Sequence, residues 1–403
     1  MRYLILILTF TSVSIFGQTW ENIFKPTQNK YYKVLNSGGE TYLLTNESYK
    51  LVIYRTTDDG SSWQKIQENK KSGTIDHYSV TADITGNGNI FIPIGISGNI
   101  TRLGFNPNSF LETFVETENS ITTIKMKSDE HGVAGNKEEL FITNNSWFQS
   151  KKITVNGLTS VWYNENNTIS YISVDEKKET TFNFSIDNGE SWNSSFVANF
   201  NAEKLYFINN NIGFIIGSLE DMETKPWTYT NLIYRTTNAG LDWNLVFKEK
   251  NEKISVLNDI SFSTNEIGIA SGFSNNVYLT YDGGKNWQNH KISGIGDNEY
   301  KLTACGFSNS KFIAAVNDYG IFALNEPLLS TEIYGTISDK YAYTIFNNEI
   351  SFENYTKKAY QISDIKGNIL QEGITFGNLK FGDIQEKHLI INLNNEFTIK
   401  LVK

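Results

Sequence analysis

The pattern Ser/Thr-x-Asp/Asn-x-Gly-x-x-Trp occurs four times in this chain and constrains its fold more than any other feature. An alternating apolar run precedes each copy and a shorter run follows it, which predicts a β-hairpin around a specialised turn. In such a turn the Asp or Asn side chain can accept backbone N–H groups, glycine supplies a positive φ, and the Trp ring packs over the turn. The structural positions are Asp58, Gly60, Trp63, Asp187, Gly189, Trp192, Asn238, Gly240, Trp243, Asp282, Gly284 and Trp287.

The four copies resemble Asp-box (BNR) repeats, which lie at the outer hairpins of β-propeller blades. Sialidases, sortilin-type receptors, some xyloglucanases and photosystem II assembly-factor-like propellers carry such repeats. The resemblance implies an all-β propeller. It implies little about activity, because enzymes and binding proteins share the repeat. For the box aspartates it implies a role in fixing the turn rather than in catalysis or metal binding.

The spacing of tryptophans predicts the number of blades. Successive steps of 84, 45, 51 and 44 residues separate Trp63, Trp147, Trp192, Trp243 and Trp287. We assign Trp147 to a shortened fifth box and place a blade without a box in the long first step, near residues 102–114. Residues 18–327 then accommodate seven blades of about 44 residues, within the usual range of about 40–50. Six or eight blades are the alternatives.

The two ends of the propeller segment complement each other. Trp20 lies 43 residues before Trp63 and opens a strand that has no partner strands nearby. Three strand-like runs at 301–307, 311–316 and 320–324 are followed by no outer strand. We therefore expect the N-terminal strand to complete the last blade and so to close the ring.

The N-terminus has the pattern of a secretory signal. Arg2 precedes a short apolar run, and Gly17 provides a small residue before the expected cleavage site. Such a run is too short to span a bilayer comfortably. We predict that residues 1–17 are a signal peptide that is removed on export, with an uncleaved anchor as the alternative. The single cysteine, Cys305, excludes a disulfide framework.

Residues 328–403 contain neither a box nor a tryptophan, and their short alternating runs predict a small β-sandwich. This segment resembles the type A C-terminal sorting domain of type IX secretion cargo in Bacteroidota. The resemblance rests on residues 360–370, which are similar to the central hairpin of that family, and on the last strand, 397–403. The Pro-Asn-Pro entry of that family is missing here. The resemblance implies the type IX secretion machinery as a partner; an ordinary accessory sandwich is the alternative.

Composition and motifs exclude several classes of function. The net charge of −9 and the lack of a basic block argue against nucleic-acid binding. The four histidines show no metal-binding spacing, and phosphate-loop and serine-nucleophile motifs are absent. Sialidases grip a carboxylate with three converging arginines, whereas Arg55 and Arg235 both precede boxes at the blade periphery. We therefore predict no cofactor, no metal and no catalytic residue, and we disfavour an enzyme.

Candidate binding residues come from strand order. The first residues of the innermost strands should surround one mouth of a central channel, where mixed aromatic, basic and acidic groups suit a glycan or a peptide. A long insertion at 219–231 adds aromatic side chains, which are common contacts on binding loops. The candidates are Tyr32, His77, Tyr78, Trp162, Glu203, Lys204, Trp227, Tyr229 and Asp259.

The sequence thus predicts a seven-bladed β-propeller of Asp-box repeats followed by a small β-sandwich. We expect a secreted or outer cell-surface protein without a transmembrane segment that binds a glycan or a surface protein. A glycoside hydrolase or lyase on the same propeller, using Glu203 and Asp259, is one alternative. A helper for the assembly of envelope proteins is another.

Overall fold

The computed structural model describes residues 20–25, 29–47, 50–68, 81–93, 98–104, 110–221, 223, 228–251, 255–272, 276–292, 295, 302–308, 311–317, 319–325, 335–338, 341–346, 349–352, 358–363, 369–375, 378–380, 388–393 and 397–402. The predicted signal peptide, 1–17, lies outside these residues. The chain divides into two compact units, Met1–Leu324 and Asn325–Lys403.

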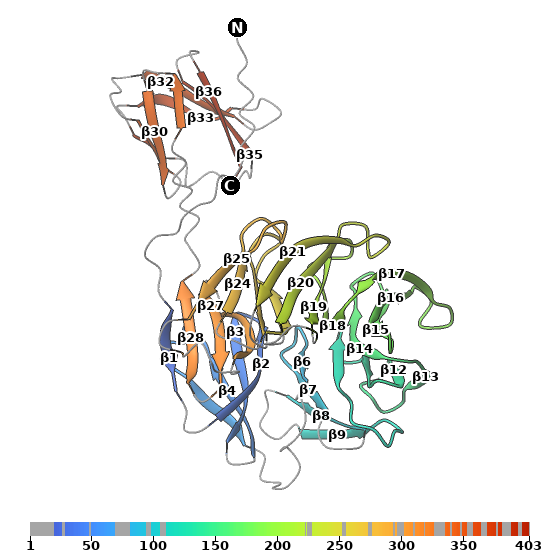
Figure 1. Ribbon diagram of the computed structural model, residues 1–403. Coiled ribbons are helices and arrows are strands. Elements are labelled where there is room, and N and C mark those ends of the chain that lie inside the picture. Colours follow the sequence, from blue (N-terminus) through green and yellow to red (C-terminus); the bar gives the residue numbers. More distant parts are fainter. Residues whose placement is uncertain are drawn as a thin grey trace. The chain divides into compact units, whose positions relative to one another are not determined.

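The first unit is a seven-bladed β-propeller in which every blade is a four-stranded antiparallel sheet (Figure 1). Blades 1 to 3 consist of β2 (Asn29–Ser37), β3 (Glu40–Glu47), β4 (Lys50–Thr56), β5 (Gln64–Glu68); β6 (Asp83–Ile84), β7 (Ile90–Pro93), β8 (Asn99–Leu103), β9 (Phe110–Phe114); β10 (Thr123–Met126), β11 (Gly132–Gly135), β12 (Glu139–Thr143) and β13 (Lys151–Thr154). Blade 2 is the predicted blade without a box.

Blades 4 to 6 repeat this order of strands. They consist of β14 (Leu158–Tyr163), β15 (Ile169–Val174), β16 (Glu179–Ser185), β17 (Asn193–Asn199); β18 (Asn201–Phe207), β19 (Gly213–Asp221), β20 (Thr228–Thr236), β21 (Asn244–Asn251); β22 (Leu257–Phe262), β23 (Gly268–Gly272), β24 (Asn276–Thr280) and β25 (Gln288–Lys291). The first strand of each blade contacts the first strand of the next blade all the way round, so these strands surround the axis.

Blade 7 closes the ring with strands from both ends of the propeller. Its inner strands are β26 (Leu302–Ser308), β27 (Lys311–Val316) and β28 (Gly320–Asn325), and its outer strand is β1 (Glu21–Phe24). The register pairs Glu21 with Ala323 and Asn22 with Phe322. The predictions of seven blades and of closure by the N-terminal strand are both confirmed.

The outer hairpins of blades 1, 4, 5 and 6 carry the box, and its side chains bond within their own turns. In blade 4 the Asp187 carboxylate accepts hydrogen bonds from the backbone N–H of Glu190 and Ser191, at 3.1 and 3.0 Å. The Ser185 hydroxyl donates to the same carboxylate at 2.7 Å and accepts from the Gly189 N–H at 2.8 Å. The Ser191 hydroxyl also donates to this carboxylate and is the main cause that holds the Asp187 pKa below its ordinary value, followed by the Ser191 N–H and the Ser185 hydroxyl.

The box glycine is required by two independent constraints, which blade 5 illustrates. Gly240 has a φ of +91°, a conformation that L-residues with a side chain rarely adopt. A Cβ at Gly240 would also approach the Phe182 ring of blade 4 to 2.2 Å. Trp243 of the same box packs edge-on against Phe182, with ring centroids 5.3 Å apart. Each box thereby attaches its own hairpin to the preceding blade.

Blade 3 has a fifth turn of this kind, but Trp147 does not occupy the tryptophan position that we assigned to it. The Trp147 N–H donates to the Thr143 hydroxyl at 3.0 Å, as the Gly60 N–H does to Thr56 at 3.0 Å in blade 1. Trp147 therefore takes the place of the glycine, with a φ of +69°. Its indole is fully buried and donates to the Met126 sulfur at 3.3 Å. This burial compensates a backbone strain of about 1–2 kcal/mol.

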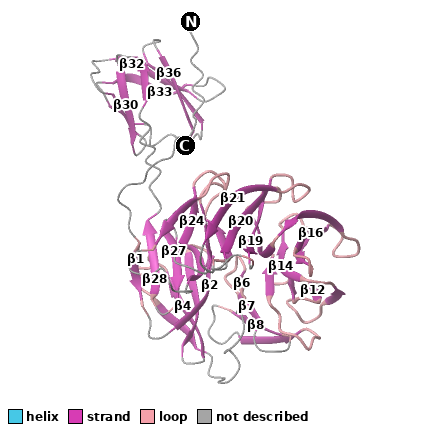
Figure 2. Cartoon of the chain, in the orientation of Figure 1, coloured by secondary structure: helices cyan, strands magenta, loops and turns pink. Residues whose placement is uncertain are grey.

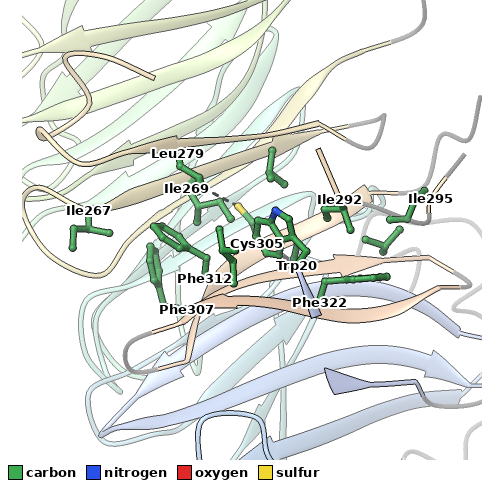
Figure 3. Packing of buried hydrophobic residues seen from close by; sticks show 14 residues of the cluster. Trp20, Ile267, Ile269, Leu279, Ile292, Ile295, Cys305, Phe307, Phe312 and Phe322 are labelled. Atoms are coloured by element: carbon green, nitrogen blue, oxygen red, sulfur yellow. Dashed lines mark hydrogen bonds between the residues drawn. The ribbon is translucent and has the colours of Figure 1, made fainter. Parts of the chain in front are cut away.

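The apolar core lies between neighbouring blades rather than in one central mass. Where blade 6 meets blade 7, Ile269 and Leu279 pack with Cys305 and Phe312, and Trp20 from the N-terminal segment joins the same cluster (Figure 3). Equivalent clusters lie at the other blade interfaces. Because each sheet buries both faces in this way, the strands carry apolar residues on both sides.

The second unit is also all-β and consists of two four-stranded antiparallel sheets, in the orders β29-β30-β31-β34 and β33-β32-β35-β36. The strands are β29 (Gly335–Ser338), β30 (Tyr341–Phe346), β31 (Glu349–Phe352), β32 (Lys358–Ser363), β33 (Ile369–Thr375), β34 (Asn378–Lys380), β35 (His388–Leu393) and β36 (Phe397–Val402). Both units consist of strands and loops (Figure 2). In the part of the chain that is described, no helix is long and apolar enough to cross a membrane.

Candidate functional site

A cavity of about 370 Å³ lies on the propeller axis, and the innermost strand of every blade contributes to its wall. Most of its lining residues stand in the middle and later part of those strands rather than at their first residues. The lining includes Lys33, Asn36, Glu40, Asp83, Ile84, Lys125, Val161, Trp162, Lys204, Tyr206, Ser261, Phe262, Ser263, Cys305 and Phe307. A volume of this size is typical of a small-molecule site.

Two ion pairs near the axis join different blades. The Lys33 ammonium of β2 donates to one oxygen of the Asp259 carboxylate on β22. The other Asp259 oxygen accepts the backbone N–H of Cys305 on β26 at 3.1 Å. Burial by itself would lower the Lys33 pKa, but the Asp259 carboxylate outweighs burial, and the pKa is raised. This pair connects blades 6, 7 and 1.

The second pair has the same construction on the opposite part of the ring. The Lys125 ammonium of β10 lies 3.1 Å from the Asp83 carboxylate of β6. The Met126 backbone N–H donates to Asp83 at 2.7 Å. The Lys125 ammonium also lies over the indole of Trp162, 4.6 Å from the ring centroid, a cation–π contact. This pair connects blades 2, 3 and 4.

Lys204 on β18 is the exception among the charged groups of the cavity. No hydrogen bond or ion pair joins its ammonium to any residue that the structure describes, although it is partly buried. Burial first, and the positive charge of Lys33 second, lower the pKa of Lys204 to about 8. Glu40, the remaining charged residue of the lining, is paired with Arg55 at 3.5 Å. The described part of the cavity therefore carries one uncompensated positive charge.

Aromatic rings form the wall next to Lys204. The ring centroids of Trp162 and Tyr206 lie 4.9 Å apart with planes inclined at 56°. The Tyr206 hydroxyl oxygen accepts the Phe262 N–H at 3.2 Å, and the Trp162 indole N–H donates to Asn164 at 3.0 Å. Burial raises the Tyr206 pKa to about 12, so this hydroxyl stays neutral at physiological pH. Both rings are thus held in place by bonds of their own.

The sequence candidates fall into four groups. Trp162 and Lys204 line the cavity, and Asp259 is buried outside the lining, where it pairs with the lining residue Lys33. Tyr229 is buried in β20 of blade 5. Glu203 is exposed and is not among the lining residues, and its pKa is raised by desolvation and by Glu220. His77, Tyr78 and Trp227 lie outside the described residues. For Tyr32 the backbone is described, but the side chain is not.

Sequence reasoning missed Lys33, Asp83, Lys125 and Tyr206. A signal for them exists in the sequence. Each stands within a short apolar strand that begins its blade, where a charged or phenolic side chain must meet a partner in order to be buried. Lys33 and Tyr206 lie one and two positions beyond the candidates Tyr32 and Lys204, Asp83 lies five positions beyond Tyr78, and blade 3, which holds Lys125, contributed no candidate.

The box carboxylates take no part in this cavity, because each is bonded inside its own outer turn. Among the residues that the structure describes, no group of three or more His, Cys, Asp or Glu side chains could hold a metal ion. The axis is therefore the place where charged, aromatic and hydroxyl groups converge.

No protein-family model matches this sequence, and no curated protein matches it. Solved structures do match its fold. YCF48 from Cyanidioschyzon merolae is 12% identical over 77% of this chain and 99% of its own, with a TM-score of 0.52. Virginiamycin B lyase from Staphylococcus aureus is 9% identical over 77% of this chain and 99% of its own, with a TM-score of 0.55.

A third structure is similar over more of the chain. PorZ, described as a surface component of the type IX secretion system of Porphyromonas gingivalis, is 8% identical over 94% of this chain, with a TM-score of 0.51. The similarity covers 60% of PorZ. At such low identity these likenesses establish the seven-bladed propeller fold alone, which hosts many unrelated functions.

Proposed function

We propose that this chain is a secreted or cell-surface binding protein whose propeller takes a glycan or protein ligand without converting it. The observation that carries the proposal is the axial cavity, to which all seven blades contribute and which combines aromatic rings with one uncompensated ammonium group. Apolar walls with a few convergent polar groups are what ligand sites generally have.

The state of the carboxylates favours binding over glycoside hydrolysis. Hydrolysis of a glycosidic bond commonly needs two carboxyl groups that are available to the substrate. Asp83, which lines the cavity, and Asp259, which lies behind the lining, are each engaged by a lysine and by a backbone N–H. Glu40, the other carboxylate of the described lining, is paired with Arg55 and accepts the Tyr42 hydroxyl. Glu203, the other carboxylate considered for the hydrolase alternative, is absent from the lining. A propeller with this wall can hold a sugar or a peptide, but it offers no obvious acid and base.

For delivery, we propose a signal peptide at 1–17 and recognition of the C-terminal unit by the type IX secretion machinery. Support comes from the sequence of residues 360–370, from the all-β second unit, and from the fold similarity to PorZ, which is described as a surface component of that system. Under this proposal the mature protein begins near Gln18.

A role in envelope protein assembly is the second candidate. Its motivation is the fold similarity to YCF48, which also has a solved structure described as bound to D1 peptide. In that case the ligand would be a segment of another protein rather than a glycan. Pull-down of the protein from the periplasm and from the released fraction separates the two candidates. A protein partner captured in the periplasm supports the assembly role, and a protein found only in the released fraction supports the secreted binding protein.

Two measurements test the proposed function. The purified full-length chain is applied to glycan and peptide arrays and, in parallel, incubated with plant and algal polysaccharides. Saturable binding with no release of products supports a binding protein, whereas turnover of any polysaccharide overturns it. Fractionation of the producing cells, with mass spectrometry of the mature termini, tests delivery, and an intact chain retained in the cytoplasm contradicts it.

A further inference from the structure

We propose that the axial cavity is a site for a carboxylated sugar ring, with the Lys204 ammonium bonded to the carboxylate and the Trp162 and Tyr206 rings against the sugar. This inference rests on the proposed binding function and specifies its ligand.

The charge balance selects a monoanion. Three lysines and two aspartates from five different blades meet near the axis, and the two ion pairs neutralise all of them except Lys204. A dianion would leave an excess negative charge beside Asp83 and Asp259. A neutral ligand would leave the Lys204 ammonium desolvated and without an opposite charge, which is costly. A single carboxylate satisfies the ammonium and restores neutrality.

The aromatic wall selects a ring over a small free ion. Trp162 is fixed by its bond to Asn164 and by the Lys125 ammonium above its face, so its orientation is set before a ligand arrives. Tyr206 is likewise fixed by its bond to Phe262. The Lys125 ammonium already covers one face of Trp162, and Tyr206 contacts both Trp162 and Phe262. The parts of these rigid rings that line the cavity supply contact area for a sugar at a low cost in conformational entropy, and acetate or chloride would leave that area without a contact.

The volume and the hydroxyl groups fit one sugar ring. A cavity of about 370 Å³ lies near the lower end of the range of small-molecule sites, about 300–1,000 Å³. Ser261 and Ser263 line it together with apolar residues such as Ile84 and Phe262. Serine hydroxyls can both donate to and accept from sugar hydroxyls. The site is thus polar enough to orient a sugar and apolar enough to receive its ring.

The test compares sodium glucuronate with glucose, which differ in one carboxylate, by calorimetric titration of the full-length chain at pH 7. Glucuronate is expected to bind at least tenfold more tightly than glucose. The Lys204→Met variant should lose at least tenfold in glucuronate affinity, while Lys248→Met, which removes an exposed lysine from the outer strand β21, should bind glucuronate as the unchanged chain does. Lys204→Met removes an unpaired charge, so folding should be retained, and its melting curve verifies this.

Several outcomes overturn the inference. Equal affinity for glucuronate and glucose, equal affinity of the Lys204→Met variant, tighter binding of acetate or sulfate than of glucuronate, or no glucuronate binding at millimolar concentration would each do so. These outcomes leave the proposed function intact when the arrays still identify another ligand. The proposed function itself fails when the arrays detect no ligand or when a polysaccharide is turned over.

Discussion

Aspartates occur both at the outer box turns and at the propeller axis, and the two sets bond in opposite ways. Asp187 at an outer turn accepts from residues three and four positions ahead of it in the chain. Asp259 at the axis accepts from Cys305, 46 residues away, and from Lys33, 226 residues away. The outer aspartate is exposed and serves its own turn, whereas the axial one is 4% exposed and joins three blades.

This difference explains which parts of the propeller repeat. A local turn can be copied with the hairpin that contains it. In blades 1, 4, 5 and 6 the Ser/Thr hydroxyl therefore donates to the box Asp or Asn and accepts from the glycine N–H, and the N–H four residues ahead donates to the same Asp or Asn side chain. The axis is a single place shared by seven unlike strands, and each strand meets a different pair of neighbours. The bonds that fix the turns are therefore repeated at the periphery, whereas the contacts at the axis differ from blade to blade.

The largest expected effect tests the exceptional turn of blade 3. Trp147→Ala should destabilise the protein by about 4 kcal/mol, because a fully buried indole is replaced by a cavity. Trp147→Gly should lose the same packing but be more stable than the alanine variant by up to about 1 kcal/mol, since its φ is positive. Urea unfolding measures both. A glycine variant less stable than the alanine variant would show that the turn does not have the geometry of a box.

The next effect breaks an axial ion pair. Asp259→Asn should cost about 3 kcal/mol, because Lys33 loses its partner in a buried setting while the Cys305 N–H can still find an amide oxygen. Chemical denaturation with fluorescence detection provides the measurement. A loss below about 1 kcal/mol in the free energy of unfolding would mean that water solvates Lys33 in place of Asp259. The axial ion pairs would then contribute no more to stability than surface ion pairs do.

Removing Lys204 should have the opposite sign. Lys204→Met should stabilise the ligand-free protein by about 1–2 kcal/mol at pH 7, because an unpaired ammonium leaves a partly buried site. The Lys204 pKa is about 8 in the fold against an ordinary value of 10.5, so between these values the unfolded chain binds the proton and the folded chain does not. The stability of the unchanged protein should therefore rise relative to the variant from pH 8 to 10.5.

Thermal melts of the two proteins across this pH range measure the difference. Taking the difference cancels the contributions of the other groups near Lys204, which are Lys33, Asp83, Lys125, Cys305, Tyr206 and Asp259 among the described residues. A gap between the two proteins that stays constant up to pH 10.5 would contradict the lowered pKa.

The smallest expected effect is at an outer turn, that of blade 6. Asp282→Asn should cost less than about 1 kcal/mol, because the asparagine oxygen can accept the Lys285 and Asn286 N–H groups that the carboxylate accepts now, at 3.0 Å each. Blade 5 already has Asn238 in this position, with its oxygen 3.0 Å from the Asp242 nitrogen. Equilibrium unfolding of Asp282→Asn and Asp259→Asn under the same conditions compares the stability lost at the two sites. Equal costs at both sites would remove the distinction between turn and axis.

Sequence and structure differ most instructively at Trp147 and at Lys204. The sequence identified a fifth turn but aligned Trp147 with the other box tryptophans. Tryptophan rarely adopts a positive φ, so nothing in the sequence indicated that Trp147 stands at the glycine position. It selected Lys204 as a binding candidate, yet it gave no reason to distinguish Lys204 from Lys33 and Lys125. The pairing that separates these three lysines depends on residues from other blades.

The sequence by itself determined the all-β class, the seven blades and the closing strand, because hairpins, alternation and box turns are local and repeat at a regular interval. It also specified which carboxylates serve the outer turns, since each bonds to its immediate neighbours in the chain. Only the tertiary structure decided that Asp83 and Asp259 neutralise two lysines and leave the third without a partner among the described residues. Closing the ring brings seven distant strands to one axis, and electrostatic energy there depends on distances in space that no spacing in the sequence specifies.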